Sequence, residues 1–186
     1  MTRTETALPG VVILEPRVFA DHRGWFFESY HTGRFEEMGI RDVFLQDNQS
    51  RSIRGTVRGL HFQLGAPQTK LVRVLQGAIW DVAVDVRHGS PTFGQWVGVE
   101  LSAEDRRQLY VPPGFAHGFS TLSGTADVLY KCSALYAPDL ERAVRWNDPC
   151  IGVDWRLEGP PVLSERDACH PYLSDLDSRD LPPYQG

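Results

Sequence analysis

The sequence predicts an all-β fold, either a sandwich or a barrel of short strands. Apolar and polar residues alternate at 71–75, 79–86, 95–101, 107–111 and 127–133, which is the pattern of half-buried strands. Turn residues separate these segments, and the 17 glycines and 13 prolines are spread along the chain rather than gathered in one linker. Several strands at a spacing of roughly ten residues are typical of a sandwich or barrel.

The remaining segments add little helix to this picture. The best helical candidate covers 32–38, with Thr32 as its N-cap and Gly39 at its end. We expect the 186 residues to form one domain, 1–186. Residues 174–186 are rich in aspartate, proline and polar residues, so we expect a loose or partner-docked tail there.

Charge and apolar runs exclude several classes of protein. The formal net charge of −5 provides no broad basic surface for polymeric nucleic acid. The chain opens without a signal-like segment and has no run of about 20 apolar residues, so we expect a cytoplasmic protein without a membrane span. Cys132, Cys150 and Cys169 are odd in number and widely spaced, which predicts reduced thiols.

Two segments carry a histidine or lysine that could do chemistry. Residues 54–63 read as a strand-like segment containing His61, three residues after Arg58, so the two side chains face opposite sides unless Gly59 hosts a bulge. A lone histidine is more often structural than catalytic. Lys70 begins an apolar strand, where it could enter a pocket or remain solvated.

Further candidates lie nearer the C-terminus. His117 sits between glycines, but neither it nor His61 has the H-x-H and carboxylate spacing of a metal site, so we expect no bound metal. Tyr130 and Tyr136 are six residues apart and could pack in a core, donate a proton or stack on a base. Asp167 closes a capping box with Ser164 and could instead orient a distant histidine.

Taken together, these segments closely resemble one family, that of dTDP-4-dehydrorhamnose 3,5-epimerases. The resemblance runs from about residue 8 to about residue 173. The motifs that carry it are DHRGWFFE at 21–28, QDNQS at 46–50, RGLHFQ at 58–63, KLVRV at 70–74, SPTFGQW at 90–96, PGFAHGF at 113–119 and LSERD at 163–167.

The resemblance implies a cupin-type jelly roll that acts as a homodimer on dTDP-4-keto-6-deoxyglucose, without metal or other cofactor. By matching position, His61 is the base, Asp167 its orienting carboxylate, Tyr130 the acid and Lys70 the cation near the C4 oxygen. The positions that match substrate contacts are Arg23, Glu28, Gln46, Asn48, Arg58, His117, Tyr136 (as the thymine-stacking ring), Glu141 and Arg166. Lysine is expected at the position of Arg166, and the two cations differ in geometry.

Three alternatives remain open at this point. A relative that inverts only C3 or only C5 would use the same base and acid. A ketoisomerase that moves the carbonyl needs a proton relay on one face, so an acid on the other face counts against it. A non-catalytic cupin that binds a nucleotide sugar would be expected to lack His61, Tyr130 or Asp167, and all three are present.

Overall fold

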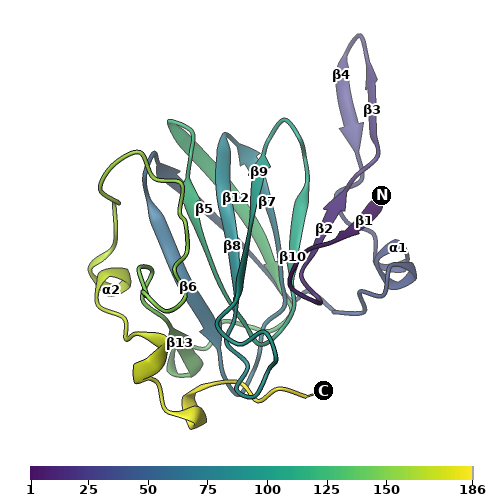
Figure 1. Cartoon of the computed structure of the whole chain (residues 1–186). Coiled ribbons are helices and arrows are strands. Elements are labelled where there is room, and N and C mark those ends of the chain that lie inside the picture. The colour runs from purple at the N-terminus through teal and green to yellow at the C-terminus, as the bar shows by residue number, and fades with distance from the viewer. Residues whose placement is uncertain (186) are drawn as a thin grey trace.

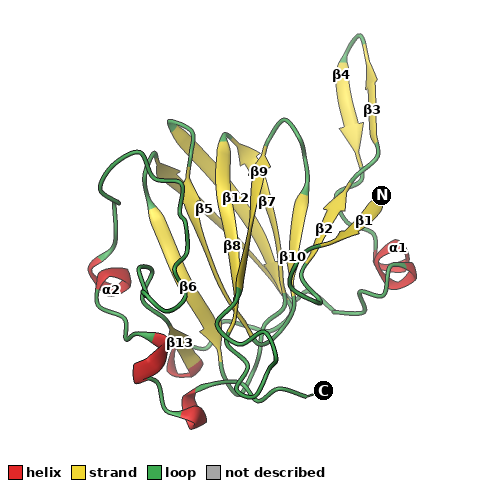
Figure 2. Cartoon of the chain, in the orientation of Figure 1, coloured by secondary structure: helices red, strands yellow, loops and turns green. Residues whose placement is uncertain are grey.

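The computed structural model describes residues 1–185 and consists of two antiparallel sheets that face each other (Figures 1 and 2). The larger sheet has six strands in the spatial order β1 (Thr2–Glu5), β2 (Val12–Glu15), β10 (Gln108–Val111), β7 (Lys70–Gln76), β12 (Thr125–Cys132) and β5 (Gln46–Ile53). The smaller sheet has five, in the order β13 (Glu141–Ala143), β6 (Val57–Gln63), β11 (Phe115–Thr121), β8 (Ala78–Asp85) and β9 (Trp96–Ser102). The all-β prediction is confirmed.

The other elements are small. A separate hairpin, β3 (Val18–Asp21) and β4 (Gly24–Phe27), projects beyond the two sheets (Figure 1). The helices are α1 (Thr32–Glu37) and α2 (Glu165–Ala168), with single 3-10 turns at Pro138–Leu140, Leu173–Asp175 and Ser178–Asp180.

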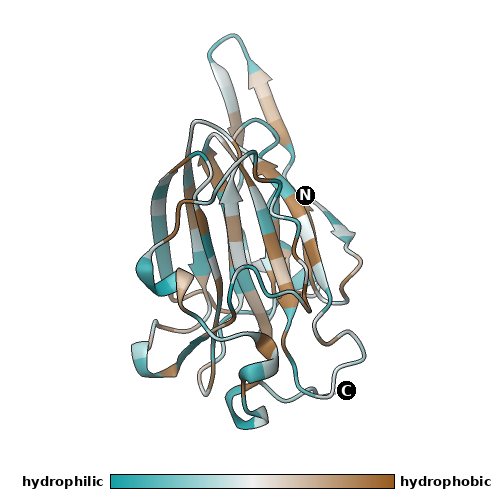
Figure 3. Cartoon of the chain, turned by 60° about the vertical axis from the view of Figure 1, so that its left-hand side comes forward, coloured by the Kyte–Doolittle hydropathy of each residue, from teal (hydrophilic) through white to brown (hydrophobic). Residues whose placement is uncertain are grey.

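The main core lies between the two sheets. Val72 and Val128 from the larger sheet meet Ala83 and Phe119 from the smaller one, and all four are almost fully buried. Each strand of a sandwich presents every second side chain to this space, so teal and brown residues alternate along several strands in Figure 3. The predicted strands at 71–75 and 127–133 therefore bury one set of alternate side chains in the core between the sheets.

The outer face of the smaller sheet is buried as well, because the chain after Ala143 folds back over it. Trp80 and Val82 of β8 belong to a second apolar cluster with Trp155 and Leu173. Strand β8 therefore contacts a core on both faces and is buried at nearly every position.

The C-terminal segment is part of this cover as far as residue 185, where the expectation was of a loose or partner-docked tail; docking on a partner stays a prediction. Leu181 is buried in the second cluster. The His88 amide donates to the Pro182 carbonyl (2.8 Å), and the Tyr184 amide donates to the His88 carbonyl (3.0 Å). The tail is polar in composition, but Leu176 and Leu181, the two backbone hydrogen bonds at His88 and an ion pair of Asp180 with Arg142 (3.0 Å) hold it to its own chain; residue 186 lies outside the described residues.

The N-cap of helix α1 lies one residue earlier than predicted. Its N-cap is His31 rather than Thr32, because the His31 ring nitrogen accepts the Arg34 amide (3.4 Å). Gly39 follows the helix in the left-handed region, as expected for a helix end. Phe35 anchors α1 against β2. Within residues 1–185, no helix is long and apolar enough to cross a membrane.

Two strands that build the site escaped the pattern analysis. Strand β11 is buried at every position and so shows no alternation. Strand β5 alternates regularly in exposure, but its residues are almost all polar, so hydrophobicity does not reveal it.

Candidate active site

A cavity of about 360 Å³ opens between the two sheets. Its walls are formed by β5, β7 and β12 of the larger sheet and by β6, β11 and β13 of the smaller one, with α2 at the side. The lining residues are Gln46, Asn48, Ser50, Arg58, His61, Gln68, Lys70, His117, Gly118, Phe119, Tyr130, Cys132, Tyr136, Glu141 and Asp167. All four predicted catalytic residues are therefore in one place.

A bulge in β6 turns both Arg58 and His61 toward this cavity. His61 pairs with His117 and Arg58 with Phe119, so two residues of β6 lie between these pairs where β11 has only one, and β6 contains one extra residue. Gly59 lies at the bulge in the left-handed region, and a Cβ there would stand 2.6 Å from the Gly118 Cα. The two glycines let the strands approach closely, and the extra residue reverses the parity that a regular strand would impose.

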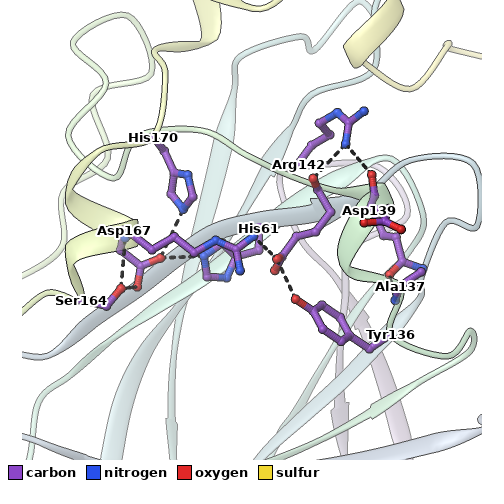
Figure 4. A network of polar contacts seen from close by, with 11 residues as sticks. His61, Tyr136, Ala137, Asp139, Arg142, Ser164, Asp167 and His170 are labelled. Carbon is purple, nitrogen blue, oxygen red and sulfur yellow. Dashed lines mark hydrogen bonds and ion pairs between the residues drawn. The ribbon is translucent and has the colours of Figure 1, made fainter.

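His61 is held by a carboxylate from a distant segment. Its Nε2 lies 2.6 Å from Asp167 Oδ1 (Figure 4). Asp167 is buried, and its other oxygen accepts the Ser164 hydroxyl at 2.9 Å, while its amide donates to the same hydroxyl at 3.0 Å. Ser164 is thus the predicted N-cap, but Asp167 accepts its hydroxyl rather than its amide, so the reciprocal half of the capping box is replaced by a bond that helps to orient the carboxylate. Although burial opposes the charge, the hydrogen bond from His61 contributes to a net lowering of the pKa of Asp167.

Lys70 places a positive charge beside the same histidine. Its Nζ donates to the His61 carbonyl at 3.3 Å. Burial lowers the pKa of Lys70, while Cys132, Glu141 and Asp81 oppose that shift. An ammonium removed from bulk water interacts strongly with any negative charge that develops close to it.

Tyr130 enters the cavity from the opposite wall. It belongs to β12 of the larger sheet, whereas His61 belongs to β6 of the smaller sheet. Burial raises the pKa of Tyr130, so its phenol keeps its proton over a wider range of pH than an exposed tyrosine. The cavity therefore has an imidazole on one wall and a protonated phenol on the other.

The rim carries a further polar cluster. Tyr136 lies beyond the end of β12, and its hydroxyl donates to Glu141 at 2.9 Å. Arg166 also forms an ion pair with Glu141, and its side chain is largely exposed. Gln46 accepts the Tyr136 amide at 2.8 Å and donates to Asn48 at 2.9 Å. Arg166 thus reaches the rim through Glu141 rather than lining the cavity itself.

The structure also reveals a second buried histidine and aspartate pair. His117 Nε2 lies 2.8 Å from Asp81 Oδ1, and the Asp81 side chain is fully buried. Sequence reasoning missed Asp81, although a carboxylate inside the apolar segment AIWDVAVD was a signal that it needed a partner. Cys132, Gln68 and Ser50 line the cavity as well and were not singled out for it.

Two predicted contact residues lie away from this cavity in the single chain. Arg23 sits at the tip of the β3 and β4 hairpin and pairs with Asp21 at 2.6 Å. Glu28 follows β4 and pairs with Arg34 at 2.8 Å. Neither residue is among those that line the cavity.

A jelly roll whose central cavity sets a histidine, a lysine and a tyrosine around one space is a cupin-type protein suited to proton transfer. The family model described as dTDP-4-dehydrorhamnose 3,5-epimerase matches residues 5–175. A relative of that name from Salmonella typhimurium is 55% identical over 91% of this chain and 93% of its own. One from Pseudomonas aeruginosa is 53% identical over 95% and 98%.

A solved structure agrees with these relatives. The dTDP-6-deoxy-D-glucose-3,5-epimerase of Legionella pneumophila, in complex with dTDP-4-keto-L-rhamnose, superposes with a TM-score of 0.97 at 48% identity, covering 100% of this chain and 99% of that one. The chain belongs to the dTDP-4-dehydrorhamnose 3,5-epimerase family. It is an isomerase of the epimerase type.

Proposed function

We propose that this protein inverts C3 and C5 of dTDP-4-keto-6-deoxyglucose and so forms dTDP-4-keto-L-rhamnose. The observation that carries the proposal is that His61 and Tyr130 line one cavity from two facing sheets. Inversion requires that a proton leave one face of the sugar and return to the other. A base and an acid on opposite walls meet that requirement.

His61 serves as the base in this mechanism. Its Nε2 hydrogen bonds to Asp167, so Nδ1 is the nitrogen left to accept the proton from carbon. The Asp167 carboxylate stabilises the imidazolium that forms. The hydrogens on C3 and C5 are acidic because the charge left on carbon moves onto the C4 oxygen as an enolate.

Lys70 and Tyr130 complete the reaction. The Lys70 ammonium faces the oxygen on which negative charge develops, an effect worth about 3 kcal/mol for a well-placed donor. Tyr130, kept protonated by its raised pKa, delivers a proton to the opposite face of the enolate. Solvent then restores both groups before the second carbon reacts.

Residues of the cavity wall and rim supply the contacts to the nucleotide. Arg58 is anchored through its Nε to Ser52 at 3.0 Å and lines the cavity, where its guanidinium suits a diphosphate oxygen. Tyr136 is 47% exposed, which leaves its ring face free to stack on thymine. Binding energy at the nucleotide would hold the sugar ring between the two walls.

We also propose a homodimer in which the β3 and β4 hairpin contacts a second copy. Phe19, Trp25 and Phe26 on this hairpin are 52%, 58% and 69% exposed. Two strands alone are marginally stable in water, and an exposed apolar patch of this kind favours a partner. In such a dimer, Arg23 at the tip of the hairpin would reach the cavity of the second copy.

Analytical ultracentrifugation tests the dimer. The wild type should sediment as a dimer, and Trp25→Ser together with Phe26→Ser should shift it toward the monomer. A wild-type monomer at all concentrations would refute this part of the proposal. Arg23→Ala then shows whether the hairpin serves the site, because it should raise KM for the nucleotide sugar without dissociating the dimer.

The activity itself is tested by incubation with dTDP-4-keto-6-deoxyglucose in deuterium oxide, with a reductase to trap the product for NMR. Deuterium at both C3 and C5, with both centres inverted, is the expected result. A single inverted centre would reassign the protein as a mono-epimerase, and binding without exchange would make it a non-catalytic cupin.

Two variants test the assigned roles. His61→Asn should abolish exchange at both carbons while binding of dTDP changes little. Tyr130→Phe should lose inversion yet still exchange hydrogen slowly, because His61 can return solvent deuterium to the face from which it took the proton. Full exchange in His61→Asn would show that another group is the base.

A further inference from the structure

Asp167 touches two imidazoles, of which the proposed mechanism uses only one. Its Oδ1 lies 2.6 Å from His61 Nε2 and 3.5 Å from His170 Nε2. The two rings meet edge to face, with centroids 5.6 Å apart and planes at 84°. Figure 4 shows the carboxylate between the two histidines.

The second imidazole, His170, is nearly buried and poorly satisfied. Its side chain is 12% exposed, and its Nε2 lies 3.5 Å from Asp167 Oδ1 without a hydrogen bond of standard geometry. A buried polar nitrogen that lacks a good partner is costly. In the tautomer that carries the ring proton on Nδ1, this nitrogen can bind a ligand instead.

We infer that His61, Asp167 and His170 form a site for one divalent transition-metal ion of the Zn²⁺ class. One ligand atom from each residue lies within 4.8 Å of the others. Two imidazole nitrogens and one carboxylate oxygen are a donor set that Zn²⁺ accepts, and a fourth position would remain for water.

The three ligand atoms start close together but must shift to hold an ion. Metal–ligand bonds of 2.0–2.1 Å in a tetrahedron place neighbouring ligand atoms about 3.3 Å apart. The separation of 3.5 Å between Asp167 and His170 already fits, the 2.6 Å between Asp167 and His61 must open, and the two histidine nitrogens, which lie within 4.8 Å of each other, must adjust to the same spacing. The ion takes the place of the proton between His61 Nε2 and Asp167, and that proton moves to Nδ1 because a metal-bound imidazole is neutral.

Surrounding contacts support this geometry. The second oxygen of Asp167 is fixed by the Ser164 hydroxyl, which leaves Oδ1 directed at both histidines. Outer hydrogen bonds of this kind commonly hold a metal-binding carboxylate in place. The absence of H-x-H spacing predicts no bound metal, but that pattern does not reveal this site because its three residues come from β6 and from the segment around α2.

Occupation of the site would inhibit the enzyme, a consequence that rests on the proposed role of His61. A metal ion bound at Nε2 leaves the proton of the neutral imidazole on Nδ1, so Nδ1 can no longer accept a proton from carbon, and the carboxylate is held by the ion. Zn²⁺ is therefore expected to act as a reversible inhibitor that a chelator relieves.

Binding is measured first, without substrate, so that the result does not depend on the activity. Calorimetry with ZnCl₂ and the visible bands of tetrahedral Co²⁺ should report one ion per chain in the wild type. His170→Gln should weaken binding by about tenfold or more. His88→Gln, which removes a histidine far along the chain from this cluster, should bind as the wild type does.

Inhibition is measured next, with each variant's rate compared to its own rate in the presence of EDTA. The Zn²⁺ concentration for half inhibition should rise in His170→Gln in proportion to the weaker binding. Binding without inhibition would support the metal site and overturn the role of His61 instead.

Three results would overturn the metal site. They are no uptake by the wild type, equal affinity in His170→Gln and the wild type, or a sulfur ligand from the neighbouring Cys169. X-ray absorption of the wild-type Zn²⁺ complex decides the last point and needs no variant to fold. It should show two imidazoles and oxygen ligands only.

Discussion

Replacing Gly118 by alanine tests whether the bulge in β6 is what aims His61 at the cavity. A Cβ at this position would lie 2.6 Å from the Arg58 carbonyl oxygen and 3.1 Å from the Gly59 Cα. Non-bonded carbon contacts lie at about 3.5–4.0 Å, so the two strands must separate by roughly 1 Å. Both obstructing atoms belong to the backbone, and no side-chain rotation relieves the clash.

The size of the effect follows from that displacement. Overpacking of this kind costs about 1–3 kcal/mol, which for a chain of this length lowers Tm by about 2–12 °C. A shift of about 1 Å in a catalytic group costs about 100-fold in rate. Because Gly118 is outside the left-handed region, the clash rather than backbone strain is the cause.

The assay is deuterium incorporation at C3 and C5 together with thermal unfolding, with Gly159→Ala as the matched control. A Cβ at Gly159 meets nothing within 4 Å. Gly118→Ala should be slower and less stable than this control. If it equals the control in both measurements, the close approach of β6 and β11 is refuted; if it loses stability but keeps its rate, the aiming of His61 is refuted.

Three further perturbations have defined outcomes. Asp167→Asn should slow exchange by about 100-fold to 10,000-fold. The reason is that an amide has one acceptor oxygen, whereas the carboxylate accepts from both His61 and Ser164. A rate within tenfold of the wild type, with dTDP binding intact by calorimetry, would contradict the orienting role of Asp167. Lys70→Met should slow exchange by about 100-fold or more. Burial lowers the pKa of Lys70, so the wild-type rate should fall as pH rises through a value below the ordinary lysine pKa of about 10.4. If this fall in rate persists in Lys70→Met, the titrating group is a residue other than Lys70. Asp85→Asn should lower the free energy of unfolding by about 3 kcal/mol at neutral pH, measured by urea denaturation. Burial raises the pKa of Asp85, but hydrogen bonds from Arg87, Ser90 and Thr92 outweigh it and the net pKa is lowered. Its contribution is therefore complete above about pH 3.9 and disappears as pH falls through the lower folded value, so a variant with unchanged acid sensitivity would count against this account.

Part of the fold could be predicted from local pattern. Local alternation in hydrophobicity predicted five strands, although one of them, β8, is buried on both faces. Strand β11 was missed because it is buried at every position and its residues do not alternate, and the packing of the tail was missed because its few apolar residues, such as Leu176 and Leu181, stand in a polar segment.

The residue types of the site could also be predicted from local sequence, but their contacts could not. The kinds of residue needed for proton transfer, and their resemblance to a family, were present in the sequence, since motifs such as RGLHFQ and LSERD are local. Their partnerships were not. His61 and Asp167 are separated by 106 positions, and Asp81 and His117 by 36. Pairing of β8 with β11 brings the second pair together, whereas the first depends on how the segment around α2 packs against β6.

The sequence by itself determined the β-rich class, the ionisable groups and the glycines that permit a bulge. Only the tertiary structure decided that Arg58 and His61 share a face, that Tyr130 opposes them, and that His170 joins Asp167. The physical reason is that strand parity can be reversed by one unpaired residue, and contacts between sheets depend on how the whole sandwich closes.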